Sequence, residues 1–277
     1  LRFKLYHDIT YYLLVNYFSV SYLYIFRLKC FYVTRNNPFL KLAPFKLEQL
    51  YIDPDVNMVH GVMNDNEIRH FIIEASPKME RTKIYPTQTS SDAEYSQYRI
   101  AKSAWFKPSY SAIMNRVSKR MADFSGLDLV SAEGLQIANY GIGGHYGPHT
   151  DFLLTSQYLG NRYATILVYL SDVTSGGATV FLNLGLSVAA KKGSAIFWRN
   201  LLSTGEGNNE TFHAACPVLV GNKWGKIYVY NLCNTADKQA SSPPDGNWSS
   251  PPMDISNTRN KGNTVAGSSI YLNHTRK

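Results

Sequence analysis

The chain has 277 residues, of which 44% are hydrophobic and 17% are charged. This is enough apolar material for one well-cored domain with extensions, and it excludes an intrinsically disordered protein. The net charge of +8 does not predict nucleic-acid binding, because residues 1–30 carry a net +3 and residues 255–277 a net +4, which leaves +1 for the residues between them.

The first 29 residues are hydrophobic, rich in tyrosine and unassigned to a domain. From Ile9 to Phe26 there are 18 residues without a charge, with basic residues on either side. A signal anchor or signal-peptide core has this pattern, because a bilayer requires about 20 apolar residues. Five tyrosines, several polar residues and the lack of a small-x-small cleavage site favour a packed or artefactual extension instead. Both interpretations stay open, and we expect membrane contact only if residues 9–26 form an anchor.

Next come an extended segment, two helices and a strand. Residues 31–55 contain three prolines and are predicted to be an extended lead-in. Residues 64–67 resemble a capping box, which predicts a helix over about 65–75. A strand is expected at Tyr98–Phe106. A second amphipathic helix, ending at Gly126, is predicted by an apolar stripe at helical spacing: Ile113, Met114, Val117, Met121 and Phe124.

From residue 135 onward the sequence changes to short β-type runs separated by glycines. The runs are Leu135–Tyr140, Ala164–Leu170, Ala178–Phe181, Ser194–Trp198, Phe212–Val220 and Trp224–Leu232. Many short strands with regular turn signals predict a mainly β protein, a sandwich or barrel of antiparallel sheets with the two helices covering one sheet. Residues 234–277 are rich in Ser, Pro and Asn and are predicted to be a disordered tail. The domain is therefore expected to span residues 30–233.

The cysteines and sequons bear on the cellular compartment. Cys30, Cys216 and Cys233 form no CxxC pair and no zinc-type spacing. They are interpreted either as three inert thiols or as one disulfide, Cys216–Cys233, with a third thiol. Asn-x-Ser/Thr sequons at Asn209, Asn247 and Asn273 lean slightly toward a secretory compartment.

The strongest chemical signal is His149-Thr150-Asp151, followed by His213 and Lys223. Alternation along a strand places His149 and Asp151 on one face, and closure of a barrel can bring His213 to them from a distant strand. Two imidazoles and one carboxylate are the protein ligands of non-haem Fe(II) oxygenases. His145 has the wrong spacing to Asp151, and the other four histidines lie outside the β region.

Lys223 is interpreted as the cation that pairs with a bound dicarboxylate. A dicarboxylate that chelates iron through one end leaves its other carboxylate inside the barrel, where an unpaired charge is costly. Lys223, with hydroxyls from Tyr140 and Thr179, can supply a cation and hydrogen-bond donors. The alternative is a solvated surface lysine.

Several long motifs resemble the catalytic domain of the animal collagen prolyl 4-hydroxylase alpha subunit. The likeness covers about 195 residues from Cys30 to Trp224, and its most specific motifs are Tyr98–Trp105, Tyr140–Asp151, Gly176–Phe181, Lys191–Trp198, Gly205–Gly207 and His213–Trp224.

This resemblance implies a double-stranded β-helix, the jelly-roll barrel, that carries an Fe(II)- and 2-oxoglutarate-dependent dioxygenase. The family hydroxylates peptidyl proline at C4, releases succinate and CO2, uses L-ascorbate to rescue oxidised iron, and acts in the endoplasmic reticulum lumen. The collagen-like substrate and a protein disulfide isomerase subunit are the implied partners.

The resemblance also implies a role for each site residue. His149, Asp151 and His213 match the iron ligands, and Lys223 matches the residue that pairs with the far carboxylate of 2-oxoglutarate. Tyr140 and Thr179 match positions lining that pocket. Tyr146 and Arg162 match positions near the peptide, and Leu153–Arg162 corresponds to a loop that closes over it.

Two departures from the family keep other functions open. Val229 stands where the family has the tryptophan of a second Lys-Trp pair, and the residues before Cys30 do not resemble the family's N-terminal peptide-binding region. A catalytically impaired relative that binds a peptide or a partner, and an oxygenase of the same family with another substrate, therefore remain alternatives.

Overall fold

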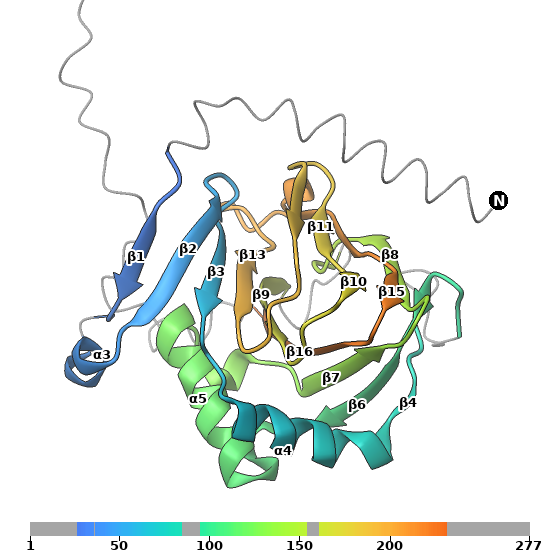
Figure 1. Cartoon of the computed structure of the whole chain (residues 1–277). Coiled ribbons are helices and arrows are strands. Elements are labelled where there is room, and N and C mark those ends of the chain that lie inside the picture. The colour runs from blue at the N-terminus through green and yellow to red at the C-terminus, as the bar shows by residue number, and fades with distance from the viewer. Residues whose placement is uncertain (1–26, 36, 85–94, 154–160, 232–277) are drawn as a thin grey trace, which may run out of the picture. The chain divides into compact units, whose positions relative to one another are not determined.

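The strands of this chain form two main antiparallel sheets that face each other (Figure 1). The structure is a computed structural model that describes residues 27–35, 37–84, 95–153 and 161–231. The larger sheet has the order β1 (Cys30–Val33), β2 (Phe45–Tyr51), β3 (Val56–His60), β13 (Ala195–Arg199), β9 (Arg162–Tyr169), β16 (Lys223–Asn231), β7 (Leu135–Tyr140), β6 (Lys102–Phe106) and β4 (Glu80–Arg81).

The smaller sheet has five strands and carries both histidines of the candidate site. Its order is β12 (Leu186–Val188), β11 (Thr179–Phe181), β14 (His213–Ala215), β8 (His145–His149) and β5 (Arg99–Ile100), while β10 (Ser175–Gly176) and β15 (Val218–Val220) form a separate pair. The chain crosses repeatedly between the sheets: β7 lies in the larger one, β8 in the smaller one and β9 in the larger one again. This arrangement confirms the predicted jelly-roll fold.

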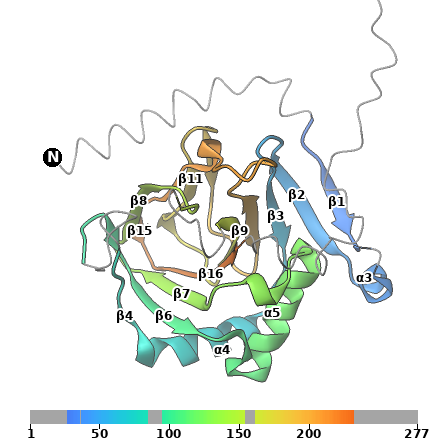
Figure 2. The same cartoon turned by 180° about the vertical axis from the view of Figure 1, so that it is seen from behind.

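Two helices cover the outer face of the larger sheet, as predicted (Figures 1 and 2). Helix α4 (Asp65–Ala75) begins with the predicted capping box, in which Asn64 and Glu67 each accept the other's backbone N–H. Helix α5 (Ala112–Ser125) ends at Gly126, whose φ of 72° lies in the left-handed region that glycine adopts most easily. A short helix, α3 (Pro38–Leu42), precedes β2, and four 3₁₀ turns complete the described helices: η1 (Ser76–Lys78), η2 (Pro108–Tyr110), η3 (Leu129–Ser131) and η4 (Asn209–Thr211).

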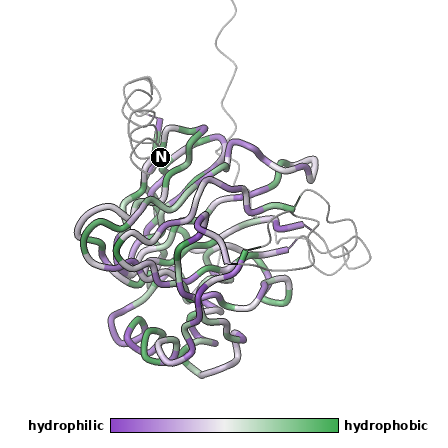
Figure 3. The backbone as a smooth tube through the Cα atoms, turned by 90° about the vertical axis from the view of Figure 1, so that its right-hand side faces the viewer, coloured by the Kyte–Doolittle hydropathy of each residue, from purple (hydrophilic) through white to green (hydrophobic). Residues whose placement is uncertain are grey.

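Helix α5 is held on the sheet by the stripe read from the sequence. Met114, Val117, Met121 and Phe124 are all fully buried. The ring of Phe124 packs edge-on against Phe197 of β13. Hydrophobic and hydrophilic residues alternate along the two helices, at the bottom of the view in Figure 3. The buried residues of each helix are mostly apolar and pack on the sheet, so the more exposed, mostly polar residues lie on the side away from the barrel.

Strand β16 contributes side chains to both faces of the larger sheet. Its odd-numbered residues Lys223, Gly225, Ile227 and Val229 line the cleft between the sheets. Its even-numbered residues lie on the helix side, where Tyr228 hydrogen-bonds Ser118 of α5 and the Lys226 ammonium lies 4.1 Å from the Phe71 ring centre of α4. One strand therefore lines the cleft with one set of side chains and packs against the helices with the other.

Lys226 is fully buried, and its Nζ has no hydrogen-bond partner among the described residues. Burial, followed by repulsion from Arg120, holds the pKa of this amine well below its usual value. We predict that Lys226→Met stabilises the protein, because it removes a buried polar group without a hydrogen-bond partner, and such a group costs about 1–3 kcal/mol.

Between the folded and unfolded pKa values of Lys226, the unfolded chain binds more protons, so wild-type stability rises with pH. The advantage of Lys226→Met should therefore be largest at low pH and shrink as the pH approaches the usual lysine pKa. Thermal melts at two pH values measure this, with an expected rise in Tm of about 2–4 °C or more at the lower pH. A Tm that falls by the same amount at both values would show that the contacts with Phe71 and Tyr228 outweigh the burial cost.

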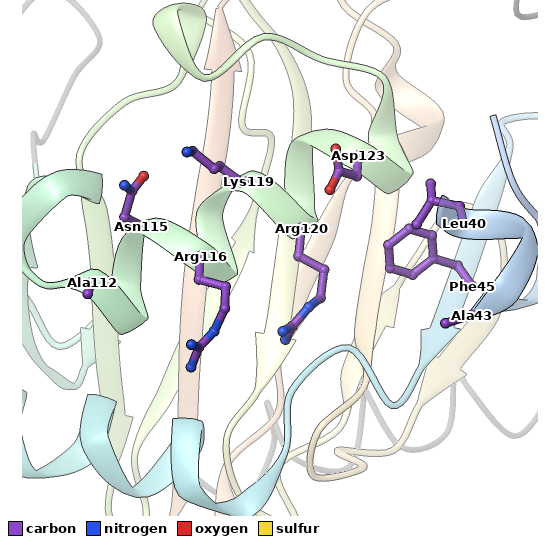
Figure 4. A pocket seen from close by; sticks show the side chains of 9 residues that line it. All are labelled: Leu40, Ala43, Phe45, Ala112, Asn115, Arg116, Lys119, Arg120 and Asp123. Carbon is purple, nitrogen blue, oxygen red and sulfur yellow. The ribbon is translucent and has the colours of Figure 1, made fainter. Parts of the chain in front are cut away.

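A shallow groove of about 560 Å³ lies on the outer side of α5 (Figure 4). Its lining comes from α5, α3 and β2: Leu40, Ala43, Phe45, Ala112, Asn115, Arg116, Lys119, Arg120 and Asp123. Arg120 makes two hydrogen bonds to the buried carboxylate of Glu67 in α4, at 2.8 and 2.9 Å. This ion pair ties α5 to α4 on the side of the sheet remote from the cleft.

Three predicted elements were wrong in detail. Residues 31–55 are not an extended lead-in, because they form β1, α3 and β2 at the edge of the larger sheet. The predicted strand Tyr98–Phe106 is divided at Ala101 into β5 and β6, which belong to different sheets. The predicted strand Phe212–Val220 is divided at Cys216 and Pro217 into β14 and β15, since proline has no N–H for a sheet hydrogen bond.

Other predictions fall outside the described residues. They are the 9–26 segment, the 234–277 tail, most of the 153–162 loop, and Cys233 with its predicted bond to Cys216. Within the part of the chain that the structure describes, none of the helices has the length and apolar character needed to cross a membrane.

Candidate iron and 2-oxoglutarate site

Two histidines from neighbouring strands meet at the centre of the smaller sheet. His149 ends β8 and His213 begins β14, and the antiparallel register makes them direct partners. Their ring centres lie 4.3 Å apart. The 64 residues that separate His149 from His213 in sequence are therefore bridged by sheet pairing, as the sequence pattern predicted.

The third member, Asp151, lies just beyond the end of β8 rather than on the strand. Its Oδ1 is 3.5 Å from Nε2 of His149, and its Oδ2 is 3.9 Å from Nε2 of His213. The three potential ligand atoms all lie within 4.8 Å of one another. The structure thus assembles the predicted His-Asp-His set on one side of the cleft.

Backbone carbonyls orient both imidazoles. Nδ1 of His149 donates to the carbonyl of Gly147, and Nδ1 of His213 donates to the carbonyl of Thr211, each at 2.9 Å. Because a carbonyl can only accept, the proton of each neutral ring resides on Nδ1, and the lone pair of Nε2 faces Asp151. This is the tautomer that a metal ligand requires.

The electrostatics of the three groups support the same assignment. Burial alone would raise the pKa of Asp151, but His213, His149 and the Thr165 hydroxyl together lower it well below its usual value. Burial, then repulsion from His149, lowers the pKa of His213 to about 4. At neutral pH the set therefore consists of a carboxylate and a neutral His213, as cation binding requires.

Lys223 is fully buried beside this set, at the start of β16. Its Nζ donates to Oγ1 of Thr179 at 3.2 Å and lies 5.9 Å from the Tyr140 ring centre. Burial lowers the pKa of the ammonium to about 8, and only the nearby Cys216 thiol acts to raise it. The arrangement excludes the surface-lysine interpretation and brings Lys223, Tyr140 and Thr179 together as predicted.

Tyr169 is a further member of this pocket that sequence reasoning missed. Its hydroxyl donates to Oγ1 of Thr179 at 2.8 Å, and its ring centre is 5.5 Å from Nζ of Lys223. Burial raises the pKa of Tyr169 above its usual value, so the hydroxyl keeps its proton. The only signal in the sequence was a tyrosine among the apolar residues of β9. No spacing pattern distinguishes such a tyrosine in a ligand pocket from one in the hydrophobic core.

One cleft of about 910 Å³ lies between the sheets and is lined by both groups of predicted residues: His149, Asp151, His213, Lys223, Tyr140 and Thr179. Tyr146 stacks on His149 at a ring-centre distance of 3.7 Å, and the guanidinium of Arg99 lies 4.4 Å from the Tyr146 ring centre. Arg162 forms a two-point ion pair with Glu133 at 2.7 and 3.1 Å. Both predicted peptide-contact residues, Tyr146 and Arg162, therefore face the cleft next to the His-Asp-His set.

Val229 closes the cleft beside that ion pair. It is 9% exposed, and its carbonyl accepts the backbone N–H of Glu133 at 2.8 Å. A tryptophan here would extend farther toward Arg162, so valine leaves more room at the position where the peptide is expected. The barrel nevertheless closes through β16, which pairs with both β7 and β9.

The remaining histidines within the described residues lie elsewhere. His145 bonds the carbonyls of Gly143 and Gln97 at the surface, which confirms its exclusion. His60 pairs with Glu48, and His70 with Ser111. His7 and His274 lie outside the described residues.

The donor set fits a ferrous ion. Two Nε2 atoms of fixed tautomer and one ionised carboxylate converge from one side, while the cleft and the Lys223 pocket open on the other. Bound Fe(II) would be held by His149, Asp151 and His213.

Comparison with known proteins agrees with this chemistry. Residues 135–229 match the family described as the 2OG-Fe(II) oxygenase superfamily. Together with the β-helix and the His-Asp-His set, this match defines the domain as a 2OG-Fe(II) oxygenase, and Fe(II) and 2-oxoglutarate are implied by that family and by the triad.

Within that class, the chain is similar to prolyl 4-hydroxylase alpha subunits. It is 45% identical over 205 residues to prolyl 4-hydroxylase subunit alpha-2 of Caenorhabditis elegans and 45% identical over 206 residues to subunit alpha-1 of Homo sapiens. Each alignment covers 72% of this chain and 38% of the relative, so the chain spans well under half the length of these relatives.

A solved structure of a viral collagen prolyl hydroxylase from Paramecium bursaria Chlorella virus-1, in complex with 2OG, shares the fold. Its TM-score is 0.52 at 25% sequence identity, with 63% of this chain and 94% of that chain covered. The alignment therefore covers nearly all of that chain.

Proposed function

We propose that this domain hydroxylates peptidyl proline at C4, using Fe(II), 2-oxoglutarate and O2 and releasing succinate and CO2. The observation that carries the proposal is the convergence of His149, Asp151, His213 and Lys223 in one cleft large enough for a peptide. The 45% identity to prolyl 4-hydroxylase alpha subunits supports proline as the target residue.

Each side chain has a distinct task in this proposal. Bound Fe(II) supplies oxygen activation and the oxidative decarboxylation of 2-oxoglutarate. The Lys223 ammonium pairs with the far carboxylate of 2-oxoglutarate, and Thr179 and Tyr140 line that end of the pocket. Burial lowers the pKa of Lys223, and a carboxylate bound beside the ammonium would offset the cost of burying its charge.

The peptide is positioned by Tyr146 and Arg162. Tyr146, held flat against His149, forms one wall of the space next to the metal ligands. Arg162, fixed by Glu133, presents its remaining N–H groups to the same space. Polyproline-like peptides have carbonyls without internal hydrogen bonds, and a guanidinium is a suitable donor to them.

The direct test is the product. The purified chain is incubated with Fe(II), 2-oxoglutarate, L-ascorbate and a collagen-like peptide, and mass spectrometry looks for the gain of one oxygen atom, with amino-acid analysis placing it at C4. Succinate should form in step with hydroxyproline. Decarboxylation that is equally fast when every target proline is replaced by alanine would reject prolyl hydroxylation and leave an oxygenase of another substrate.

Replacing Arg162 by glutamine should raise the apparent KM for the peptide by roughly 10-fold or more, because a hydrogen bond to a charged group contributes about 1.5–3 kcal/mol. The KM for 2-oxoglutarate should stay unchanged, since Lys223 lies at the other end of the cleft. Glu133→Gln is the companion variant and should give a smaller rise, because it removes only the anchor of Arg162. An unchanged peptide KM in Arg162→Gln would remove Arg162 from peptide binding.

A second candidate function follows from Val229. With valine beside Arg162 and Glu133, the peptide wall is shallower than a tryptophan would make it, which favours weaker prolyl hydroxylation or a different peptide. Val229→Trp distinguishes these: a lower peptide KM supports an impaired prolyl hydroxylase, whereas a loss of turnover supports a substrate that needs the extra space.

The proposal extends to the domain's surroundings. Residues 30–233 form the oxygenase domain in this proposal, and residues 1–29 and 234–277 are extensions of it. The domain acts in the endoplasmic reticulum lumen, with protein disulfide isomerase as a partner. Asn209, the sequon residue within the described part, is exposed at η4, as an N-glycan requires. Mass spectrometry of the chain from a secretory host reports the Asn209 glycan and the Cys216–Cys233 bond together.

A further inference from the structure

Asp151 is held by side chains that none of the assigned roles includes. The Thr165 hydroxyl donates to Oδ2 of Asp151 at 2.6 Å, and Nδ2 of Asn200 donates to Oγ1 of Thr165 at 2.9 Å. Thr165 is 1% exposed and Asn200 is 0% exposed. A continuous buried chain of hydrogen bonds therefore ends on the carboxylate of the His-Asp-His set.

This series of hydrogen bonds begins on the larger sheet and ends at Asp151, beside the smaller sheet. Thr165 lies on β9 opposite Trp198 of β13, and Asn200 follows the end of β13. The backbone of Asn200 is tied on both sides, through its N–H to the carbonyl of Tyr163 at 2.7 Å and through its carbonyl to the N–H of Asn208 at 2.8 Å. Asp151 itself lies outside a strand, so the larger sheet supplies the rigidity that its own segment lacks.

The direction of the hydrogen bonds is determined by the chemistry of the three groups. A threonine hydroxyl has one proton and two lone pairs. Because Asn200 donates to Thr165, the Thr165 proton is directed to Oδ2 of Asp151, which accepts it. Oδ2 is thereby occupied, while Oδ1, which faces Nε2 of His149, remains available for a cation.

A structural role alone does not account for Asn200. Its own Oδ1 is buried and has no hydrogen-bond partner among the described residues, which costs free energy. Asparagine at this position is thus unfavourable for packing, yet its amide donates to the residue that holds Asp151. A buried amide with an unsatisfied oxygen is more common at a functional site than in a packed core.

We propose that Asn200 and Thr165 are positioning residues that orient the Asp151 carboxylate for one-oxygen binding of the metal. The inference rests on the proposed role of His149, Asp151 and His213 as metal ligands, and it is independent of whether the substrate is a prolyl peptide. Asn200 acts entirely through Thr165, and Thr165 acts entirely through Asp151.

The test measures binding of Co(II), used as an air-stable probe, by calorimetry and by its visible absorption, in the full chain. Thr165→Val keeps the shape but removes the hydroxyl, and it should weaken Co(II) binding roughly 10–100-fold and alter the absorption band. Thr165→Ser restores the hydroxyl and should restore both. Asn200→Ala should weaken binding by less, because Thr165 can still donate to Asp151 without a fixed direction.

Two further variants make the result specific. The double variant Thr165→Val with Asn200→Ala should bind Co(II) no more weakly than Thr165→Val alone, since Asn200 has no route to the metal except through Thr165. Ser118→Ala removes a different buried hydroxyl, the one bonded to Tyr228, and should lower the Tm while leaving Co(II) affinity unchanged.

The outcomes separate this inference from the proposed function. Tight Co(II) binding by wild type with equal affinity in Thr165→Val overturns the positioning role and leaves the metal site intact. Additive losses in the double variant also overturn it, because they show independent effects. Failure of wild type to bind Co(II) or Fe(II) rejects the metal site and this inference together.

Discussion

Replacing His149 by alanine is expected to lower peptide-coupled formation of succinate by more than about 100-fold, because even partners of metal ligands commonly contribute 10–100-fold to metal affinity or activity. The Gly147 carbonyl fixes the tautomer of the His149 ring, so that Nε2 is available to the metal. The described residues offer no other imidazole at that position. The assay follows succinate from 2-oxoglutarate with Fe(II) and a proline-rich peptide.

The control for this variant is His145→Ala. His145 lies four residues earlier on the same strand, bonds only backbone carbonyls, and is absent from the cleft lining. Its loss should leave the rate within about twofold of wild type, since it touches no site residue. If His149→Ala and wild type give the same rate, the enzymatic proposal fails.

Lys223→Ala is expected to raise the apparent KM for 2-oxoglutarate by roughly 30-fold or more, because removing one partner of a buried charge pair costs about 2–5 kcal/mol. The variant loses the ammonium that donates to Thr179 in the buried end of the cleft. The peptide KM should change little, since Arg162 lies at the other end. Steady-state kinetics with each substrate varied in turn measures both constants.

The matched control is Lys226→Met, which removes the other fully buried lysine of β16 from the opposite side of the sheet. It should leave the KM for 2-oxoglutarate unchanged. An unchanged KM in Lys223→Ala as well would remove Lys223 from its assigned role.

The same lysine predicts a pH dependence. Burial lowers the pKa of Lys223 to about 8 in the unliganded domain, so the ammonium is charged below that pH and neutral above it. Affinity for 2-oxoglutarate should therefore fall as the pH rises above about 8, approaching tenfold for each pH unit, because binding must then take up a proton. Calorimetry across this range should show the step in wild type and its absence in Lys223→Ala.

The candidate site was predicted well where a local pattern carries a geometric rule. A histidine that ends one β run can pair with a histidine that begins another, as His149 and His213 do. Alternation also placed Asp151 near His149, although Asp151 lies just beyond the end of β8. The helices were predictable for the same reason, because the Asn64 capping box and the apolar stripe before Gly126 each depend only on neighbours in sequence.

The sequence by itself determined which side chains can serve as metal ligands and their order along the chain. It also determined the hydrophobic periodicities that produce the strands and helices. Only the tertiary structure decided that Tyr98–Phe106 splits between sheets at Ala101, that Tyr169 reaches Thr179, and that Asn200 and Thr165 support Asp151. These facts depend on register between strands far apart in sequence, and a shift of one residue would turn every side chain to the opposite face. Local patterns do not contain that register, because it is set by the packing of the whole barrel.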